Sequence, residues 1–208
     1  MNENLERIGI GTEERYECIY TTVDENGNKN AAAIGFKYFG NDDVGCRIFE
    51  GSKTLKNIQK TKKYVVNITQ NPLIFTKSTI GKLPDECFTD DEDIAILKDA
   101  GSYIIVNVCD INEQKAENTP IDNDQSIFMI KGKIKDVIIK DESVKAFNRG
   151  LGALIECLVN YSRYKIVDDE KRAKYMDIVN ENQRMISRIG SEKTKNAMKT
   201  IKEEYEKN

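Results

Sequence analysis

The chain has 208 residues, of which 39% are hydrophobic and 32% charged, enough for one domain of ordinary size with a further appendage. Its 32 basic and 35 acidic residues leave a formal net charge of -3, which argues against nucleic acid as a partner. The sequence has no histidine, which excludes a Ser-His-Asp triad, a Cys-His dyad and the usual histidine-bound zinc or haem.

The sequence also argues against secretion and membrane insertion. No apolar run of the signal-peptide kind stands near the N-terminus, and no stretch approaches the roughly 20 apolar residues that cross a bilayer. Five scattered cysteines without a CxxC pair fit neither a disulfide framework nor a zinc site. We therefore expect a soluble, cytoplasmic protein without a membrane or metal partner.

Strand-like segments dominate the first 140 residues. The β-branched and aromatic residues 16–23, the turn DENGNKN and a second extended run at 31–39 predict a hairpin. A short helix is expected to begin near Ser52. Further strands are expected at 44–51, 64–69, 101–111 and 126–139. About six strands and one helix predict a barrel that closes most of its own edges.

The connections between these strands are polar or irregular. Asn71-Pro72 is expected to close the strand 64–69, because the residue before a proline favours an extended or turn conformation. Residues 77–100 are acidic and read as irregular, and residues 112–124 read as a polar loop.

The character of the sequence changes after residue 140. Ser143 is a candidate cap for a helix with a broad apolar stripe that runs to about residue 164. Two charged helices are expected at 168–189 and 191–206, divided at Gly190-Ser191 into an antiparallel hairpin. We therefore divide the chain into a barrel domain, 1–140, and a helical segment, 141–208, packed on it.

The segment RIFEGSKTLKN, from Arg47 to Asn57, places a glycine, two hydroxyls and a lysine where a strand meets a helix. Free N–H groups and the helix dipole favour an anion there, and Ser52, Lys53 and Thr54 can add donors and charge. The alternative is that Ser52 only caps the helix and Lys53 is solvated. The segment predicts a phosphate site, with that structural role as its competitor.

The run TTVDENGNKNAAAIG places three alanines in a predicted strand, although alanine is a weak strand former. Residues 31–35 project little bulk from either face of the strand, so a planar ring could lie against its backbone. Small residues could equally accommodate the taper of a barrel or a crossing helix.

Taken in order, these segments resemble the FMN-binding split barrel superfamily of flavin reductases and pyridoxamine phosphate oxidases. TTVDENGNKNAAAIG is similar to the flavin reductase pattern of TT, a turn with glycine, then N-A. GSKT, a helix and YVVNIT are similar to the oxidases' phosphate turn, helix and next strand. A closer resemblance covers nearly the whole chain. TTV, NAAAIG, FEGSKTLKN, VVNIT, NPLIF and FNRGLGALIE, with Arg163, are similar to the archaeal DUF447 family, mostly from methanogens, some with FMN bound.

The resemblance implies an α+β fold that is mainly β barrel, an FMN-binding split barrel with a C-terminal helical extension. It implies FMN as the cofactor, with its ring along Ala32, Ala33, Ile34 and Gly35 and its phosphate on Ser52, Lys53 and Thr54. Arg47 and Ile48 lie on the next strand, and Asn71 with Pro72 would approach the ring edge. Where the oxidases have an arginine before their lysine, this chain has Ser52 before Lys53, and Thr54 replaces the lysine. Only Lys53 is then charged, so one fewer charge would face the phosphate.

The activity stays open at this point. The resemblance favours a homodimeric, flavin reductase-like oxidoreductase that uses NAD(P)H or another small-molecule donor, with no catalytic residue identified. Alternatives are an FMN-binding electron-transfer protein, a split barrel that uses deazaflavin F420, and a structural module without a cofactor. The sequence does not assign roles to Asn148, Arg149, Glu156 and Arg163.

Overall fold

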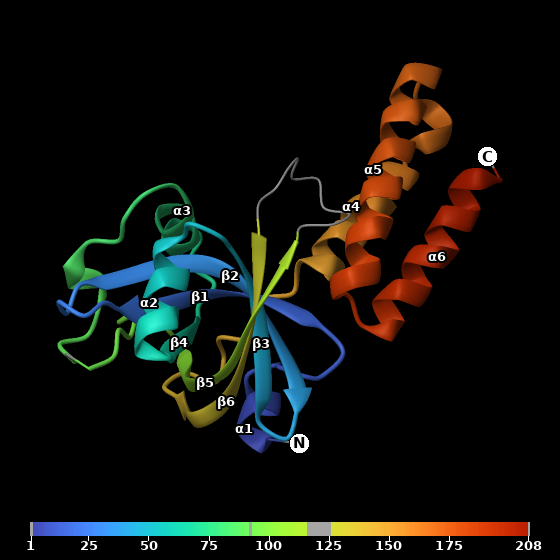
Figure 1. The fold of residues 1–208 in the computed structure, drawn as a ribbon. Coiled ribbons are helices and arrows are strands. Elements are labelled where there is room, and N and C mark those ends of the chain that lie inside the picture. Colours follow the sequence, from blue (N-terminus) through green and yellow to red (C-terminus); the bar gives the residue numbers. More distant parts are fainter. Residues whose placement is uncertain (1, 92, 116–125, 208) are drawn as a thin grey trace. The chain divides into compact units, whose positions relative to one another are not determined.

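The chain forms two compact units in the computed structural model, which describes residues 2–91, 93–115 and 126–207. The barrel unit comprises residues 2–12 and 17–147 (Figure 1). The helical unit comprises residues 13–16 and 148–207. Residues 112–115 of the predicted loop 112–124 are not loop but continue a strand, and the rest of that prediction lies outside the described residues.

The barrel unit confirms the predicted fold. Six strands close into a barrel in the order β1-β2-β3-β6-β5-β4 (Figure 1). The pairs β2–β3, β3–β6, β6–β5, β5–β4 and β4–β1 are antiparallel. The strands are β1 (Arg15–Val23), β2 (Lys29–Gly40), β3 (Asp43–Phe49), β4 (Lys63–Ile68), β5 (Ser102–Lys115) and β6 (Ser126–Ile139).

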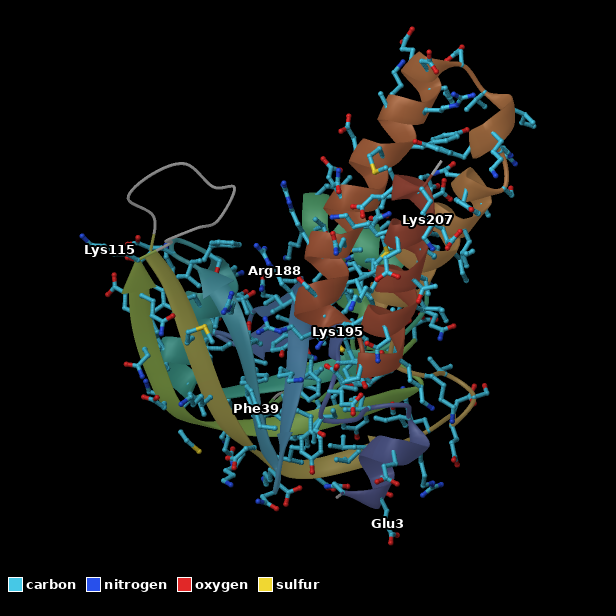
Figure 2. All side chains as sticks on the ribbon, turned by 90° about the vertical axis from the view of Figure 1, so that its right-hand side faces the viewer. Glu3, Phe39, Lys115, Arg188, Lys195 and Lys207 are labelled. Carbon is cyan, nitrogen blue, oxygen red and sulfur yellow. The ribbon has the colours of Figure 1, made fainter. Side chains whose placement is uncertain are left out.

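Large aromatic side chains fill much of the space that the strands enclose. Tyr20, Phe36, Tyr38 and Tyr64 are almost completely buried. The rings of Tyr20 and Tyr64 stack at 5.1 Å between centroids. On the outside, the exposed ring of Phe39, labelled in Figure 2, lies over Gly45, where a Cβ atom would come within 3.0 Å of it. The alternation of strand residues thus sorts aromatic side chains between the core and the surface.

Two helices of the barrel unit differ from the prediction. Helix α1 (Glu3–Arg7) was not expected, because five residues are too few to show a helical period. Helix α3 (Pro72–Ile80) begins where Asn71-Pro72 was expected only to end a strand. Proline also fits the first turn of a helix, and Asn71 caps it. The apolar residues of α3 itself fall on every side of the helix, so its sequence gives no amphipathic signal.

A second buried cluster lies under the segment that follows α3, which includes the short 3-10 helix η1 (Asp85–Cys87). Its fully or nearly buried members are Ile19, Ile74, Leu83, Phe88, Ala95, Leu97 and Ala100. Ala31 and Ala33 of β2 pack against this cluster. Residues 81–91 and 93–100, in the stretch expected to be irregular, therefore form a packed cover over β1 and β2, and we call them the cover segment.

The helical unit contains α4 (Arg149–Tyr161), the 3-10 helix η2 (Tyr164–Ile166), α5 (Asp169–Ile189) and α6 (Glu192–Glu206). The predicted cap at Ser143 is wrong. Asn148 caps α4, because its Oδ1 accepts a hydrogen bond from the N–H of Gly150 at 2.7 Å. The Ser143 hydroxyl instead donates to Asp141. The predicted division at Gly190-Ser191 is confirmed, with Ser191 capping α6.

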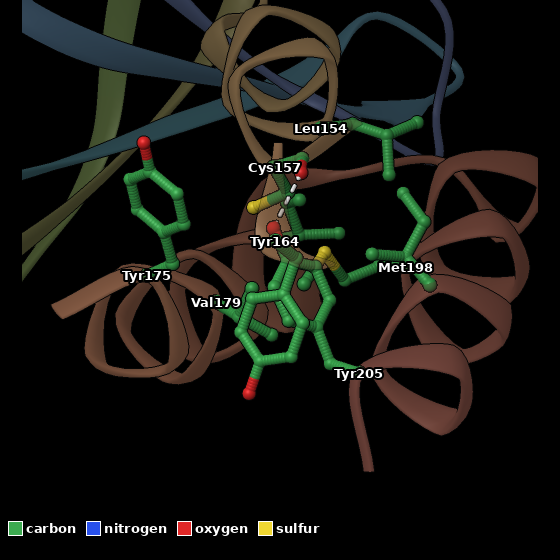
Figure 3. Close-up of a cluster of buried hydrophobic side chains, with 9 residues drawn as sticks. Leu154, Cys157, Tyr164, Tyr175, Val179, Met198 and Tyr205 are labelled. Atoms are coloured by element: carbon green, nitrogen blue, oxygen red, sulfur yellow. Dashed lines mark hydrogen bonds between the residues drawn. The ribbon is translucent and has the colours of Figure 1, made fainter. Parts of the chain in front are cut away.

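The three helices share one core, shown in Figure 3. Leu154 and Cys157 of α4 meet Val179 of α5 and Met198 and Tyr205 of α6 there. The Tyr205 hydroxyl donates to the carbonyl oxygen of Cys157 at 2.8 Å. The other face of α4 keeps four apolar side chains exposed, namely Leu151, Ile155, Leu158 and Val159. The predicted apolar stripe is thus wider than the face that this core buries.

Candidate functional site

The start of α2 (Lys53–Thr61) has the features of an anion site. Gly51 precedes it in the left-handed region, with φ at 80° and no atom within 4 Å of the place where a Cβ would stand. Ser52 caps the helix, its Oγ accepting the N–H of Leu55 at 3.1 Å. Within the described chain, no acceptor is found for the backbone N–H groups of Lys53 and Thr54. These N–H groups remain able to bind an anion.

Two amide–hydroxyl hydrogen bonds fix α2 to the β1–β2 hairpin. Asn30 Nδ2 donates to Thr54 Oγ1 at 2.9 Å, and Asn57 Nδ2 donates to Thr22 Oγ1 at the same distance. Thr54 is 2% exposed, so its side chain is engaged with the hairpin and only its backbone N–H is placed for a ligand. Sequence reasoning missed Asn30 and Asn57, although Asn30 stands directly before the alanines.

The alanine strand has two different faces at its start. Lys29 donates from Nζ to the carbonyl oxygen of Thr89 at 2.6 Å, and Ala31 and Ala33 pack against the cluster beneath that same segment. Asn30 points instead to Thr54 on α2, so Ala32 and Ile34 share the face of the strand that meets this helix. The small side chain of Ala33 therefore has a packing role against this cluster.

Gly35 lies further along β2 and is exposed. A Cβ atom added to it would meet nothing within 4 Å. The backbone there is open to the approach of a planar group, which is the arrangement that glycine favours where a ligand lies close to a strand.

Arg47 and Ile48 differ in what they can offer. Arg47 is exposed at a position of β3 that pairs with Met129 of β6, so its guanidinium is accessible. Ile48 is 4% exposed and is part of the core, which leaves only its backbone for a ligand. Both precede the Glu50-Gly51 turn that leads into α2.

Asn71 stands apart from the start of α2. Its Oδ1 accepts the N–H of Leu73 at 3.0 Å, and its own N–H donates to Thr69 Oγ1 at 3.1 Å. These bonds make it the cap of α3, which packs against β2. A pocket of about 730 Å³ lies beside this helix, lined by Glu17, Gln70, Pro72, Phe75, Thr76 and Phe147. The structure thus places Ser52, Lys53 and Thr54 at the start of α2, and Ala32 and Ile34 on the face of β2 that meets this helix. Ala33 packs instead against the second buried cluster, and Asn71 caps α3.

Other reactive groups give no second centre in the described part of the chain. Burial raises the pKa of the Cys46 thiol to about 12 and that of Cys18 further, so both stay protonated. Among the residues that the structure describes, no group of three metal-binding side chains is found. No described helix is both long and apolar enough to cross a membrane.

The chain is similar to several solved structures. An FMN-bound protein from Methanosarcina mazei is 26% identical, matches 96% of this chain and 98% of its own length, and gives a TM-score of 0.54. Flavoredoxin of Desulfovibrio vulgaris (Miyazaki F) is 14% identical over 65% of this chain and 76% of its own, with a TM-score of 0.48. The styrene monooxygenase flavin reductase from Pseudomonas putida S12 is 10% identical over 67% of this chain and 87% of its own, with a TM-score of 0.48.

Two family models match the chain. The model described as "Protein of unknown function (DUF447) N-terminal domain" matches residues 16–139. The model described as "Protein of unknown function (DUF447)" matches residues 148–203. Because the two matches together cover most of the sequence, the chain belongs to the DUF447 family.

Proposed function

We propose that this chain binds FMN, with the phosphate at the start of α2 and the ring along β2. The observation that carries the proposal is the FMN-bound protein of the same family, which aligns over nearly the full length of both chains. The donor set fits such a group, since two backbone N–H groups, the Ser52 hydroxyl and the exposed side chain of Lys53 all belong to the start of one helix. Gly51 leaves open space directly before these donors, and Gly35 leaves open space at β2.

The residues have different tasks under this proposal. Lys53 supplies the full charge for the phosphate, and the N–H groups of Lys53 and Thr54 supply directed donors. Ala32, Ile34 and Gly35 bind the ring and its ribityl chain mainly through their backbone. Other contributions come from Ala33 and Ile48 through their backbone groups, from the Arg47 guanidinium, and from Asn71 at the ring edge.

The finer proposal is a flavin reductase-like oxidoreductase that takes electrons from NAD(P)H and works as a homodimer in the cytoplasm of an archaeon. Bound FMN supplies hydride and electron chemistry, so the chain needs no histidine for it. The protein's part is to hold the phosphate, to orient the ring and to leave one ring face open to a donor. An exposed, unhindered strand at Gly35 agrees with that requirement.

The test is a titration of the purified chain with FMN, followed by absorbance and by quenching of flavin fluorescence. We expect saturable binding of one FMN per chain and weaker binding of riboflavin, which lacks the phosphate. A protein that leaves the FMN spectrum and fluorescence unchanged would overturn the proposal, and deazaflavin F420 would then be titrated in the same way.

Activity is tested separately by adding NADH or NADPH to the FMN complex without oxygen. Bleaching of the flavin absorbance within seconds supports the oxidoreductase. An FMN complex that neither nucleotide bleaches, but that dithionite reduces, would assign an electron-transfer role instead. Light scattering of the same complex measures whether two chains associate.

A further inference from the structure

The proposed site consists of two halves from different parts of the sequence. One half is β2, which would carry the ring, and the other is the first turn of α2, which would carry the phosphate. Asn30 is the first residue before the alanines of β2, and Thr54 is the second residue of α2. The hydrogen bond of 2.9 Å between their side chains joins the two halves where they meet.

We propose that Asn30 is a positioning residue that sets the distance between the ring half and the phosphate half of the site. The inference rests on the proposed binding of FMN. Asn30 acts through Thr54, whose hydroxyl is buried and whose backbone N–H faces the start of the helix. A ligand that spans both halves gains from this fixed distance, because binding of its second part is then effectively intramolecular.

The physical consequence is specific to ligands that reach both halves. FMN has a ring and a phosphate, whereas riboflavin has the same ring and ribityl chain without the phosphate. Without this hydrogen bond, α2 is held less firmly to β2. The ring half stays intact, and only the distance between the ring half and the phosphate half is no longer fixed. Loss of Asn30 should therefore weaken FMN binding and spare riboflavin binding.

The second hydrogen bond between α2 and the hairpin provides a matched control. Asn57 to Thr22 has the same chemistry and the same length of 2.9 Å, and both residues are buried. It lies about one helical turn further from the start of α2. Removing either amide leaves one threonine hydroxyl without its partner. The bond of Asn57 is buried and that of Asn30 only partly buried, so the loss of Asn57 should cost at least as much stability as the loss of Asn30.

The experiment compares the dissociation constants of FMN and riboflavin for wild type, Asn30→Ala and Asn57→Ala, with melting temperatures measured on the same samples. For Asn30→Ala we expect the preference for FMN over riboflavin to fall about fivefold, as expected for the loss of one hydrogen bond. Asn57→Ala should lose at least as much thermal stability as Asn30→Ala and keep the wild-type preference.

Thr54→Val removes the other partner of the bond and should reproduce the effect of Asn30→Ala. The double variant should then be no worse than either single variant, since only one interaction is lost. An unchanged FMN preference in Asn30→Ala, or an equal fall in Asn57→Ala, would overturn the inference. A wild-type chain that binds no FMN would instead remove the proposed function, so the two failures are distinguishable.

Discussion

Asn67 and Leu97 are joined in the barrel unit by a hydrogen bond of 2.9 Å from the backbone N–H of Leu97 to Oδ1 of Asn67. The same side chain donates from Nδ2 to the carbonyl oxygen of Ile19 at 3.1 Å and to Thr21 Oγ1 at 2.8 Å. Asn67 and Leu97 are fully buried. One amide thus anchors the cover segment to β1 and β4 and satisfies polar groups that water does not reach.

Asn67→Ala should lower the free energy of unfolding by about 2–4 kcal/mol, because it removes three hydrogen bonds and leaves buried groups unpaired. Urea unfolding followed by circular dichroism measures this loss. Asn107→Ala, at an exposed position of the neighbouring strand β5, is the control and should change the free energy by less than about 0.5 kcal/mol. Equal losses in the two variants would show that the anchor contributes nothing.

The packing of Ala33 against the cover segment predicts the effect of a larger side chain there. Ala33→Phe should lower the free energy of unfolding by about 1–3 kcal/mol through overpacking. Gly35→Val, two residues along the same strand, meets open space and should keep wild-type stability while weakening FMN binding. An Ala33→Phe variant with normal stability but without FMN binding would place that side chain against the ring instead.

The strands could be predicted because runs of β-branched and aromatic residues bounded by turn residues are typical of a sheet. Helix α3 could not be predicted in this way, because its apolar residues occupy every face. The proline at its first position is also a residue that commonly follows the end of a strand. The cover segment was missed for another reason. Its order comes from Asn67 and from apolar contacts with β1 and β2, which are distant in sequence and leave no local period.

The site could be predicted only where its residues form a local pattern in the sequence. Ser52 and Lys53 belong to a local signal, a glycine and a capping serine before a helix, and the cap is present in the structure. The roles of Thr54 and Asn30 depend on a contact across 24 residues, which no local pattern reveals. Thr54 was expected to offer its hydroxyl to a phosphate, but that hydroxyl is buried against Asn30.

Two buried tyrosines predict opposite effects of the same change. Tyr64 is 2% exposed, its hydroxyl has no hydrogen-bond partner in the described chain, and burial raises its pKa well above the ordinary value. Tyr64→Phe should therefore keep or raise stability, because a desolvated hydroxyl is removed. Tyr205→Phe removes the bond to the Cys157 carbonyl and should cost about 1 kcal/mol. Chemical unfolding of both variants measures the difference, and a loss in Tyr64→Phe as large as in Tyr205→Phe would contradict it.

The turn before β2 should respond to acid. The side-chain amide of Asn28 is the main cause that lowers the Asp24 pKa below its ordinary 3.8, followed by the N–H groups of Asn28 and Asn26. The stabilising effect of the Asp24 carboxylate is therefore complete above that ordinary value and is lost as the pH falls through the lower folded value. Melting temperatures of wild type and Asp24→Asn should therefore converge as the pH falls below 3.8. A constant difference between them from neutral pH to acid would contradict this assignment.

The charge of Lys53 provides the sharpest test of the phosphate position. Lys53→Glu reverses a charge beside two open backbone N–H groups, so FMN binding should fall by about tenfold or more while the fold is kept. Lys56→Glu makes the same change in net charge on the same helix, at an exposed position one turn further on, and should change FMN binding far less. Riboflavin binding should respond weakly to both variants, since it has no phosphate. Equal effects of the two variants on FMN would mean that the helix acts only through its overall charge, and the phosphate would then have to lie elsewhere.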